Sequence, residues 1–537
     1  MKPEHHSKDL LKGAFILSIA AIITKILSAV YRVPFQNIVG DVGFYIYQQV
    51  YPFYGIALVL STYGFPLIIS KLYAERESQN DQLAKERLLI VSTLFISSIG
   101  VLSFIALYMG STWLANYMGD PELSMLLKVI AIVFLIFPIV SVIRGYFQGL
   151  GEMVPTAVSQ VGEQAVRVGT ILIAATLLMR EGYNLYIVGA GAVLGSVTGG
   201  LVSTFILITF FWIWRRKKGF LPLRKYMDIK DCKVIVKALV VQGFAICVSS
   251  LLLIFLQLAD SLNLYSLLIS EGLNSEDAKE LKGIYDRGQP LIQLGTVVAT
   301  SIALSLVPLI SSRRVINNSV LLHEKINIAL RISIMIGVGA TVGLLAIIKP
   351  TNIMLFKNTN GNEVLSLLCF IIVLSSIIIT VTAVLQGLGN TLFPAIVILF
   401  GFGIKYILNI ILVPNFSTLG AALASIVSLL FILAVIYMKL RAIVRKRIVH
   451  IKFLLIVLAA SITMFIGVKG FLFTTNMIFH LGNDRILASL QAVSAVIIGG
   501  FIYLFMMIKS NVFKEEELVL LPFGSKLMML LPRKNRR

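Results

Sequence analysis

The sequence predicts an all-α polytopic membrane protein with about fourteen transmembrane helices, arranged as two pseudo-symmetric six-helix lobes plus two C-terminal helices. Three observations predict this fold. The 537 residues are 58% hydrophobic and only 14% charged, with a mean hydropathy of +0.91, outside the range of soluble domains. Apolar runs of about 20 residues, long enough to cross a bilayer, recur along the chain. The phrase QGLG occurs twice, between apolar runs of both halves.

The apolar runs are continuous, whereas strands of a membrane β-barrel are about ten residues long and alternate in polarity. We therefore expect helices. The first run follows three lysines, as in a signal peptide, but no A-x-A-like cleavage site follows, so we expect an uncleaved first span. The expected spans lie near residues 13–33, 44–70, 88–112, 125–149, 153–178, 184–214, 234–259, 288–311, 327–348, 364–386, 391–413, 416–438, 452–473 and 486–508.

The net charge of +21 is unevenly distributed. Basic residues concentrate in alternate loops, such as RRKKGFLPLRK (215–225) and RAIVRKR (441–447), while ANYMGDPELS (115–124) has none. This pattern predicts cytoplasmic N- and C-termini in a plasma membrane. Anionic membrane lipids account for the basic loops, so we expect no nucleic-acid partner.

The sequence offers no support for metal, cofactor or enzyme chemistry. Cys232, Cys247 and Cys369 are scattered, and the five histidines form no cluster with ligand spacing. We find no nucleophile and base pair, P-loop or dinucleotide motif, and no loop long enough for a catalytic domain. We therefore expect neither an enzyme nor a bound cofactor.

The repeated phrase predicts the domain organisation. Gln148 aligns with Gln386, and a second pair, Pro66 and Pro308, aligns at a similar offset. Each copy holds six spans, an even number, so both copies have the same orientation and are related by an axis along the membrane normal. The predicted parts are an N-terminal lobe (1–214), a basic cytoplasmic linker (215–233), a C-terminal lobe (234–440), two additional helices (441–508) and a basic cytoplasmic tail (509–537).

Ionisable residues inside the spans are the candidate site residues, because each costs about 2.5–3.5 kcal/mol at the bilayer centre and usually faces a cavity or a partner. The first span carries Lys25 and, two helical turns later, Arg32, which therefore share one face. Pro34 then limits the helix. Arg32 is alternatively a residue that reaches the membrane surface through a long side chain.

Other candidates lie in both copies of the repeat. Glu163 and Arg167 stand at i and i+4, a spacing that forms an intrahelical pair or contributes to a substrate site. At the offset of the QGLG phrases Arg167 aligns with Lys405 in the second copy, and under a one-residue shift it aligns with Tyr406. Two further positions complete the set: Arg144, one turn before Gln148, and the adjacent Asp286 and Arg287 at the start of the eighth span.

Cations outnumber carboxylates among these candidates. Lysine and arginine give a favourable potential for an anion, above all for phosphate, which arginine binds with two parallel hydrogen bonds. Exporters of cationic drugs need a free buried carboxylate instead, and Glu163, the clearest mid-span carboxylate, has Arg167 beside it. The composition of the spans therefore favours an anionic substrate.

Four stretches carry a resemblance to a known family: LLKGAFILSIAAIITKILSAVYRVPFQNIVG (10–40), YGFPLIISKL (63–72), GYFQGLG (145–151) and LVPLIS (306–311). With the fourteen spans, they resemble the stage V sporulation protein B/MurJ group of the multidrug/oligosaccharidyl-lipid/polysaccharide exporter superfamily. The resemblance covers essentially the whole chain. It is strongest to Gram-positive polysaccharide-biosynthesis-type members, and so implies a bacterial protein.

The resemblance implies two six-helix lobes in a V shape around a cationic central cavity, the MATE/MurJ-like fold, with a groove for a lipid tail at the last two helices. MurJ-type members move lipid II, an undecaprenyl-pyrophosphate-linked cell-wall precursor. Lys25 and Arg32 resemble the basic pair of the family's first span, and Asp286 and Arg287 resemble its Asp-Arg motif. The basic residues that the family has in its second span are absent from FYIYQQVYPFYGIALVL (44–60).

Together, the residues and the resemblance predict a flippase. It would bind the pyrophosphate of a polyprenyl-linked saccharide through Lys25, Arg32 and Arg287 and carry it from the cytoplasmic to the outer leaflet by alternating access. Two alternatives remain open: a cation-coupled multidrug exporter of the same fold, and a non-transporting membrane scaffold that binds enzymes of cell-wall or spore-envelope synthesis. The sequence leaves the saccharide and the coupling ion undetermined.

Overall fold

The computed structural model describes residues 3–79, 81–216, 228–310, 318–445, 448–478 and 484–510. These residues form helices joined by short turns, and within these ranges there is no β-strand. Most of the predicted basic linker and of the basic tail lies outside the described residues. The described chain divides into two compact units.

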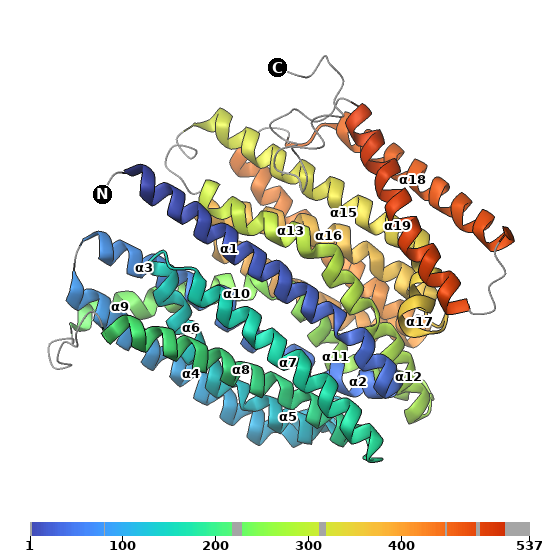
Figure 1. The fold of residues 1–537 in the computed structure, drawn as a ribbon, viewed down its shortest axis with the longest axis horizontal. Helices are drawn as coiled ribbons and strands as arrows, with labels where there is room; N and C mark the ends of the chain where they lie inside the picture. The colour runs from blue at the N-terminus through green and yellow to red at the C-terminus, as the bar shows by residue number, and fades with distance from the viewer. Residues whose placement is uncertain are drawn as a thin grey trace. The chain divides into compact units, whose positions relative to one another are not determined.

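Unit 1 comprises Met1–Asp286 and Asn390–Ala424. Figure 1 shows its helices from blue to green, with α7 and α8 packed along each other. Its elements are α1 (Pro3–Val30), α2 (Arg32–Val59), the π-helical turn η1 (Leu60–Gly64), α3 (Phe65–Ser78), α4 (Gln82–Tyr117), α5 (Leu123–Ala131), α6 (Val133–Gly149), α7 (Val154–Arg180), α8 (Leu185–Arg216), α9 (Ile229–Ala238), the π-helical turn η3 (Leu239–Gly243), α10 (Phe244–Ser250), α11 (Leu252–Ser270), α12 (Ser275–Asp286) and the first part of α17 (Leu392–Val444).

Unit 2 comprises Arg287–Gly389 and Ser425–Arg537. Its helices are α13 (Gly288–Ile310), α15 (Ser319–Phe356), α16 (Asn362–Gly387), the second part of α17, α18 (Ile451–Ile478) and α19 (Asp484–Lys509). The two C-terminal helices pack against α15 through an apolar core, and the Tyr503 hydroxyl donates to the Met335 carbonyl oxygen at 2.8 Å. The predicted additional helices are therefore part of the core of unit 2.

Twelve described helical segments are long and apolar enough to cross a membrane. Two of them, Ile16–Ser78 and Leu392–Val444, each contain two predicted spans, and the predicted seventh span is divided into Ile229–Ser250 and Leu252–Ser270. The predicted eighth span falls on α13. All fourteen predicted runs thus lie on helices, and the all-α polytopic fold class is confirmed. The predicted bounds of the two lobes stay a prediction.

Between α1 and α2 lies a single turn residue, Tyr31, which keeps helical dihedrals (φ −61°, ψ −25°) and whose position Pro34 explains. A proline ring clashes with the carbonyl group four residues before it, here that of Val30, the last residue of α1. The proline is tolerated within the first turn of α2, because backbone N–H groups there have no helical partner. The helical path nevertheless continues past Pro34, so the predicted helix limit is wrong. The first two spans are separated at Gly40, whose φ of 71° and ψ of −174° are not helical.

Both QGLG phrases adopt the same local structure. The amide of Gly151 donates to the Gln148 carbonyl oxygen at 3.0 Å, and the amide of Gly389 donates to that of Gln386, also at 3.0 Å. Both glycines have left-handed φ values, of 80° and 85°, which glycine adopts without a steric penalty. Each phrase therefore ends one helix and reverses the chain into the next, as the repeat predicts.

Two helical segments of unit 1, α2–η1–α3 and α9–η3–α10, approach each other closely near their π-helical turns. Each turn, η1 and η3, ends in a glycine followed by phenylalanine, Gly64-Phe65 and Gly243-Phe244. A Cβ atom on Gly64 would lie 1.7 Å from the Cys247 Sγ atom, so only glycine fits at this crossing. The thiol of Cys247 thus occupies space that any other residue at position 64 would need.

Candidate anion-binding site

Arg32 is a buried cation with unused hydrogen-bond donors. It is the first residue of α2, and its side chain is fully buried. Its Nε, Nη1 and Nη2 atoms have no hydrogen-bond partner in the described part of the chain. Its guanidinium lies over the Tyr51 ring, 4.3 Å from the centroid, which offsets only part of the cost of burying the charge.

Arg167, in the middle of α7, is equally buried but largely bonded. Its Nη1 atom donates to Gln164 Oε1 at 3.2 Å, and its Nη2 atom donates to the hydroxyl oxygens of Tyr31 at 2.9 Å and Tyr47 at 3.0 Å. The guanidinium also lies 4.1 Å from the centroid of the Tyr54 ring. Arg167 is therefore held in a fixed orientation.

Tyrosines line both arginines. The hydroxyl oxygens of Tyr31 and Tyr47 are 2.8 Å apart. The centroid of the Tyr51 ring lies 4.3 Å from the guanidinium carbon of Arg32 and 5.6 Å from that of Arg167. Tyr31 is the residue between α1 and α2, and the other three tyrosines, Tyr47, Tyr51 and Tyr54, belong to α2. Residues spaced four and then three apart share one helical face, so α2 presents these three rings together.

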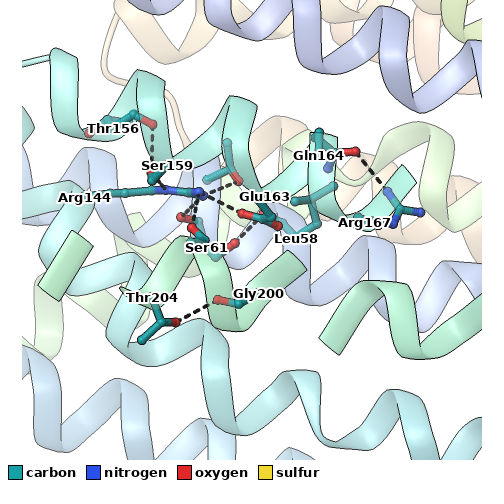
Figure 2. A network of polar contacts seen from close by, with 12 residues as sticks. Leu58, Ser61, Arg144, Thr156, Ser159, Glu163, Gln164, Arg167, Gly200 and Thr204 are labelled. Atoms are coloured by element: carbon teal, nitrogen blue, oxygen red, sulfur yellow. Dashed lines mark hydrogen bonds and ion pairs between the residues drawn. The ribbon is translucent and has the colours of Figure 1, made fainter. Parts of the chain in front are cut away.

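A second arginine network lies one to two turns away along α7 (Figure 2). The Arg144 guanidinium on α6 donates to Glu163 Oε2 at 2.8 Å, to Ser203 at 3.0 Å and to Ser159 at 3.1 Å. It also donates to Thr62 and to the Ser61 carbonyl oxygen. Each of its three nitrogens therefore has at least one acceptor.

The intrahelical pair of Glu163 with Arg167, one of the two interpretations of their i, i+4 spacing, is wrong. Glu163 pairs with Arg144 across the helix interface, while Arg167 is bonded to Gln164 and two tyrosines. Tyr54 connects the two networks, since its hydroxyl donates to Glu163 Oε1 at 3.4 Å while its ring faces Arg167. The two arginines thus lie at opposite ends of one polar chain.

Lys405 also has a partner that spacing does not reveal. It lies on α17 within unit 1, and its Nζ atom donates to Asp260 Oδ2 at 2.6 Å. Asp260 accepts further bonds from the Tyr285 hydroxyl at 3.0 Å and from the Asn409 amide at 3.1 Å. The alignment of Lys405 with Arg167 in the repeat therefore places both in polar networks, but with different partners.

Asp286 and Arg287 fall on either side of the boundary between the two units. In unit 1, both carboxylate oxygens of Asp286 accept from Lys282 Nζ at 2.7 Å. In unit 2, Arg287 is fully buried, donates to Asn358 Oδ1 at 2.7 Å and to Asn352 Oδ1 at 3.3 Å, and lies over the Phe356 ring. Each residue is thus part of a local network of its own unit.

Lys25 remains partly exposed, and in the described part of the chain no hydrogen bond or ion pair involves it. A single turn residue with helical dihedrals, Tyr31, lies between its helix and that of Arg32. Of the predicted site residues, the structure brings Arg32 and Arg167 together around shared tyrosines. It brings Arg144 and Glu163 together as an ion pair.

Sequence reasoning missed the tyrosines and the Asp260 pair. The tyrosines were visible as the spacing 47, 51 and 54 in FYIYQQVYPFYG, but aromatic residues at this spacing are equally typical of an apolar core. The pairing of Lys405 with Asp260 joins residues 145 positions apart, and no local signal encodes it.

Comparisons with known proteins agree with this architecture. The model of a family described as polysaccharide biosynthesis protein matches residues 10–314. The chain is 44% identical over 526 residues to the "Uncharacterized membrane protein YabM" of Bacillus subtilis (strain 168), covering 98% of this chain and 97% of that protein. It is 26% identical to the "Lipid II flippase MurJ" of the same organism, covering 93% of this chain and 95% of that protein.

Solved structures show the same fold. "Lipid II flippase MurJ, inward closed conformation" matches with a TM-score of 0.65 at 17% identity, over 92% of this chain and 98% of that chain. An inward-facing "multidrug resistance MATE family transporter of the MOP superfamily" matches with a TM-score of 0.60 at 16% identity, over 81% and 99%. The chain is a multi-pass membrane protein that belongs to the polysaccharide biosynthesis protein family, with MurJ and stage V sporulation protein B among its relatives.

Proposed function

We propose that this chain is a flippase that moves a polyprenyl-pyrophosphate-linked saccharide from the cytoplasmic to the outer leaflet of the plasma membrane by alternating access. The observation that carries the proposal is Arg32, a fully buried cation whose three nitrogens have no hydrogen-bond partner in the described ranges. A buried charge left unpaired is costly, so its retention indicates a ligand. Phosphate oxygens match the planar donor fork of arginine.

The family supports this substrate class. The chain belongs to the polysaccharide biosynthesis protein family and is related along almost its full length to a protein named as a lipid II flippase. Lipid II or another lipid-linked saccharide of cell-wall or polysaccharide synthesis is therefore the proposed cargo. A membrane potential that is negative inside favours export of an anion by about 2.3 kcal/mol per charge per 100 mV, so no nucleotide site is required.

Two parts of the proposal stay predictions. One is that Lys25 and Arg287 bind the same headgroup as Arg32. The other is that both termini are cytoplasmic, as the distribution of basic residues predicts. Membrane lipids and the lipid-linked saccharide are the proposed partners, and binding of cell-wall or spore-envelope enzymes belongs to the scaffold alternative.

A cation-coupled multidrug exporter would use the same fold, but the ion pairs of Glu163 and Asp260 in unit 1 do not favour it. Such an exporter needs a buried carboxylate that is free to bind a cation. Glu163 forms an ion pair with Arg144 at 2.8 Å, and Asp260 forms an ion pair with Lys405 at 2.6 Å. Each of these two carboxylates is already paired with a cation of the chain itself, whereas none of the three guanidinium nitrogens of Arg32 has a partner in the described residues.

Reconstitution tests the proposal directly. Purified full-length protein in liposomes should move a fluorescent polyprenyl-pyrophosphate-linked saccharide between leaflets, and Arg32→Ala should slow this movement at least about tenfold. Arg180→Ala is the matched control, because Arg180 is an exposed arginine at the end of α7. Wild type and Arg180→Ala, but not Arg32→Ala, should restore growth to a strain depleted of its lipid II flippase.

Two outcomes would overturn the proposal. Export of cationic drugs that requires Glu163 but tolerates Arg32→Ala would establish the multidrug alternative. Restoration of cell-wall synthesis by a protein that moves no lipid-linked saccharide in liposomes would establish the scaffold alternative.

A further inference from the structure

Arg32 and Arg167 are equally buried and share the same tyrosines, yet their hydrogen bonds differ. All three nitrogens of Arg32 lack a partner in the described chain, whereas both terminal nitrogens of Arg167 are bonded. The two residues therefore have different roles, although the sequence offered both as substrate contacts. Arg32 is available for a ligand, and Arg167 is engaged in holding its neighbours.

The contacts of Arg167 fix two hydroxyl groups. Its Nη2 atom has two protons and donates to the hydroxyl oxygens of Tyr31 and Tyr47, at 2.9 and 3.0 Å. Its Nη1 atom is bonded to Gln164, one turn earlier on the same helix, and its planar face rests on the Tyr54 ring. This planar fork can hold both hydroxyls at once because its donor directions are rigid.

Counting protons shows that one donor remains. Arginine only donates, and a tyrosine hydroxyl donates one proton and accepts others. The Tyr31 and Tyr47 oxygens each accept from Arg167 and lie 2.8 Å apart, so one hydroxyl donates to the other. The second hydroxyl proton is left over, and within the described ranges no further acceptor lies at hydrogen-bond distance from either oxygen.

The tyrosine hydroxyl group with the unused proton lies near Arg32. Tyr31 directly precedes Arg32 in the chain, and the centroid of the Tyr51 ring lies 4.3 Å from the Arg32 guanidinium carbon and 5.6 Å from that of Arg167. This place therefore combines three unpartnered nitrogens of Arg32, which carry five N–H groups, with one unused hydroxyl donor. A ligand that satisfies several converging donors must present several acceptor oxygens, as a phosphate or pyrophosphate group does.

We infer that Arg167 is a positioning residue, which orients the Tyr31 and Tyr47 hydroxyls so that one of them donates to an oxygen of the phosphate group bound by Arg32. This inference rests on the proposed function and extends it, because it assigns different roles to the two buried arginines. Arg32 provides charge and direct contact. Arg167 acts on the ligand through the tyrosines.

A double-mutant cycle tests the inference with geranylgeranyl pyrophosphate as the probe, its dissociation constant being measured on the full chain in lipid nanodiscs. The variants are Arg167→Lys, the tyrosine pair Tyr31→Phe/Tyr47→Phe, and all three changes combined. Lysine keeps the positive charge but lacks the planar fork, and phenylalanine keeps the ring but lacks the hydroxyl. Arg180→Lys and Tyr183→Phe are matched controls, since both residues are exposed.

Each of the first two variants should weaken binding about tenfold, the value of one hydrogen bond to a charged group. Because both remove the same contact, the combined variant should also weaken binding about tenfold rather than about a hundredfold. A purely structural role of Arg167 would change the thermal stability of the ligand-free protein without this coupling in affinity. An additive, about hundredfold, loss would overturn the inference, as would unchanged affinity of the tyrosine pair.

Failure of the proposed function has a separate signature. If wild type does not bind geranylgeranyl pyrophosphate, or if Arg32→Ala binds it as tightly as wild type, the anion site itself is refuted. If wild type binds and Arg32→Ala does not, the function stands. The double-mutant cycle of Arg167 with Tyr31 and Tyr47 then tests only the positioning role of Arg167.

Discussion

Glu163 accepts a hydrogen bond from Arg144 on the neighbouring helix at 2.8 Å, and its bond partners do not include Arg167, one turn along its own helix. The pair is buried, with side-chain exposures of 0% for Arg144 and 8% for Glu163. A buried ion pair contributes little relative to apolar residues of the same size, but loss of one partner leaves an unpaired charge. The ion pair thus connects α6 to α7.

This relationship predicts a large and reciprocal loss of stability. Glu163→Gln and Arg144→Met should each lower the free energy of unfolding by about 3–5 kcal/mol, because each leaves the other residue buried without its counterion. The combination Arg144→Met/Glu163→Met should recover most of this loss. Thermal unfolding in detergent measures all three, with Arg180→Met as the exposed control. Equal destabilisation by the double and single variants would contradict the pairing.

Arg32 should behave in the opposite way. Its three unpartnered nitrogens cost free energy in the ligand-free protein, and stacking on Tyr51 returns only part of it. We therefore expect Arg32→Met to leave the free energy of unfolding unchanged or to raise it by about 1 kcal/mol, while movement of the lipid-linked saccharide falls at least about tenfold. Melting temperatures and liposome assays on the same preparations measure both effects. A loss of stability as large as that of Arg144→Met would indicate a structural role.

The fold was predictable from the sequence because the length of an apolar run is set by the thickness of the bilayer. All fourteen predicted runs lie on helices, and the glycines of both QGLG phrases adopt the turn that ends a helix. What the runs did not encode are interruptions within a span. The break at Leu251 divides the seventh span, and no adjacent proline or glycine in the sequence indicates it.

The site was predictable only in part. The cost of burying charge identified Arg32, Arg144, Arg167 and Lys405 as residues that need a partner or ligand. It did not identify the partners, because helix spacing describes neighbours on one helix, whereas Lys405 meets Asp260 across two helices. The distinction between a satisfied arginine and an unsatisfied one depends on those tertiary contacts, and so appears only in the structure.

The close contact between η1 and α10 predicts a steric double-mutant effect. Gly64→Ala places a Cβ atom 1.7 Å from Cys247 Sγ, which forces the two helices apart and should cost about 1–3 kcal/mol. Cys247→Ala removes that sulfur and leaves the nearest remaining contact, to the Cys247 Cβ atom, at 3.0 Å. The double variant should therefore be more stable than Gly64→Ala alone, as measured by thermal unfolding. Gly110→Ala, where the added Cβ meets nothing within 4 Å, is the control.

Asp231, in the first turn of α9, belongs to an ion-pair network whose contribution to stability should depend on salt. Its two carboxylate oxygens accept from Arg76 on α3 at 2.8 Å and from Arg87 on α4 at 2.9 Å. The three side chains keep exposures of 11%, 14% and 21%, so water and ions partly screen them. Asp231→Asn removes the carboxylate that the two guanidinium groups share, although Arg87 keeps Asp228 at 3.8 Å. The change should cost about 1–2 kcal/mol, between the values for exposed and buried pairs.

Ionic strength separates this electrostatic effect from a packing effect at the same position. The difference in melting temperature between wild type and Asp231→Asn should shrink as salt rises from about 0.05 to about 0.5 M, because the Debye length falls severalfold over this range. Asp228→Asn is the matched control: Asp228 is 54% exposed and 3.8 Å from Arg87, and asparagine preserves its cap on the amide of Lys230. A difference for Asp231→Asn that salt does not change would show that the residue stabilises α9 by contacts other than its charge.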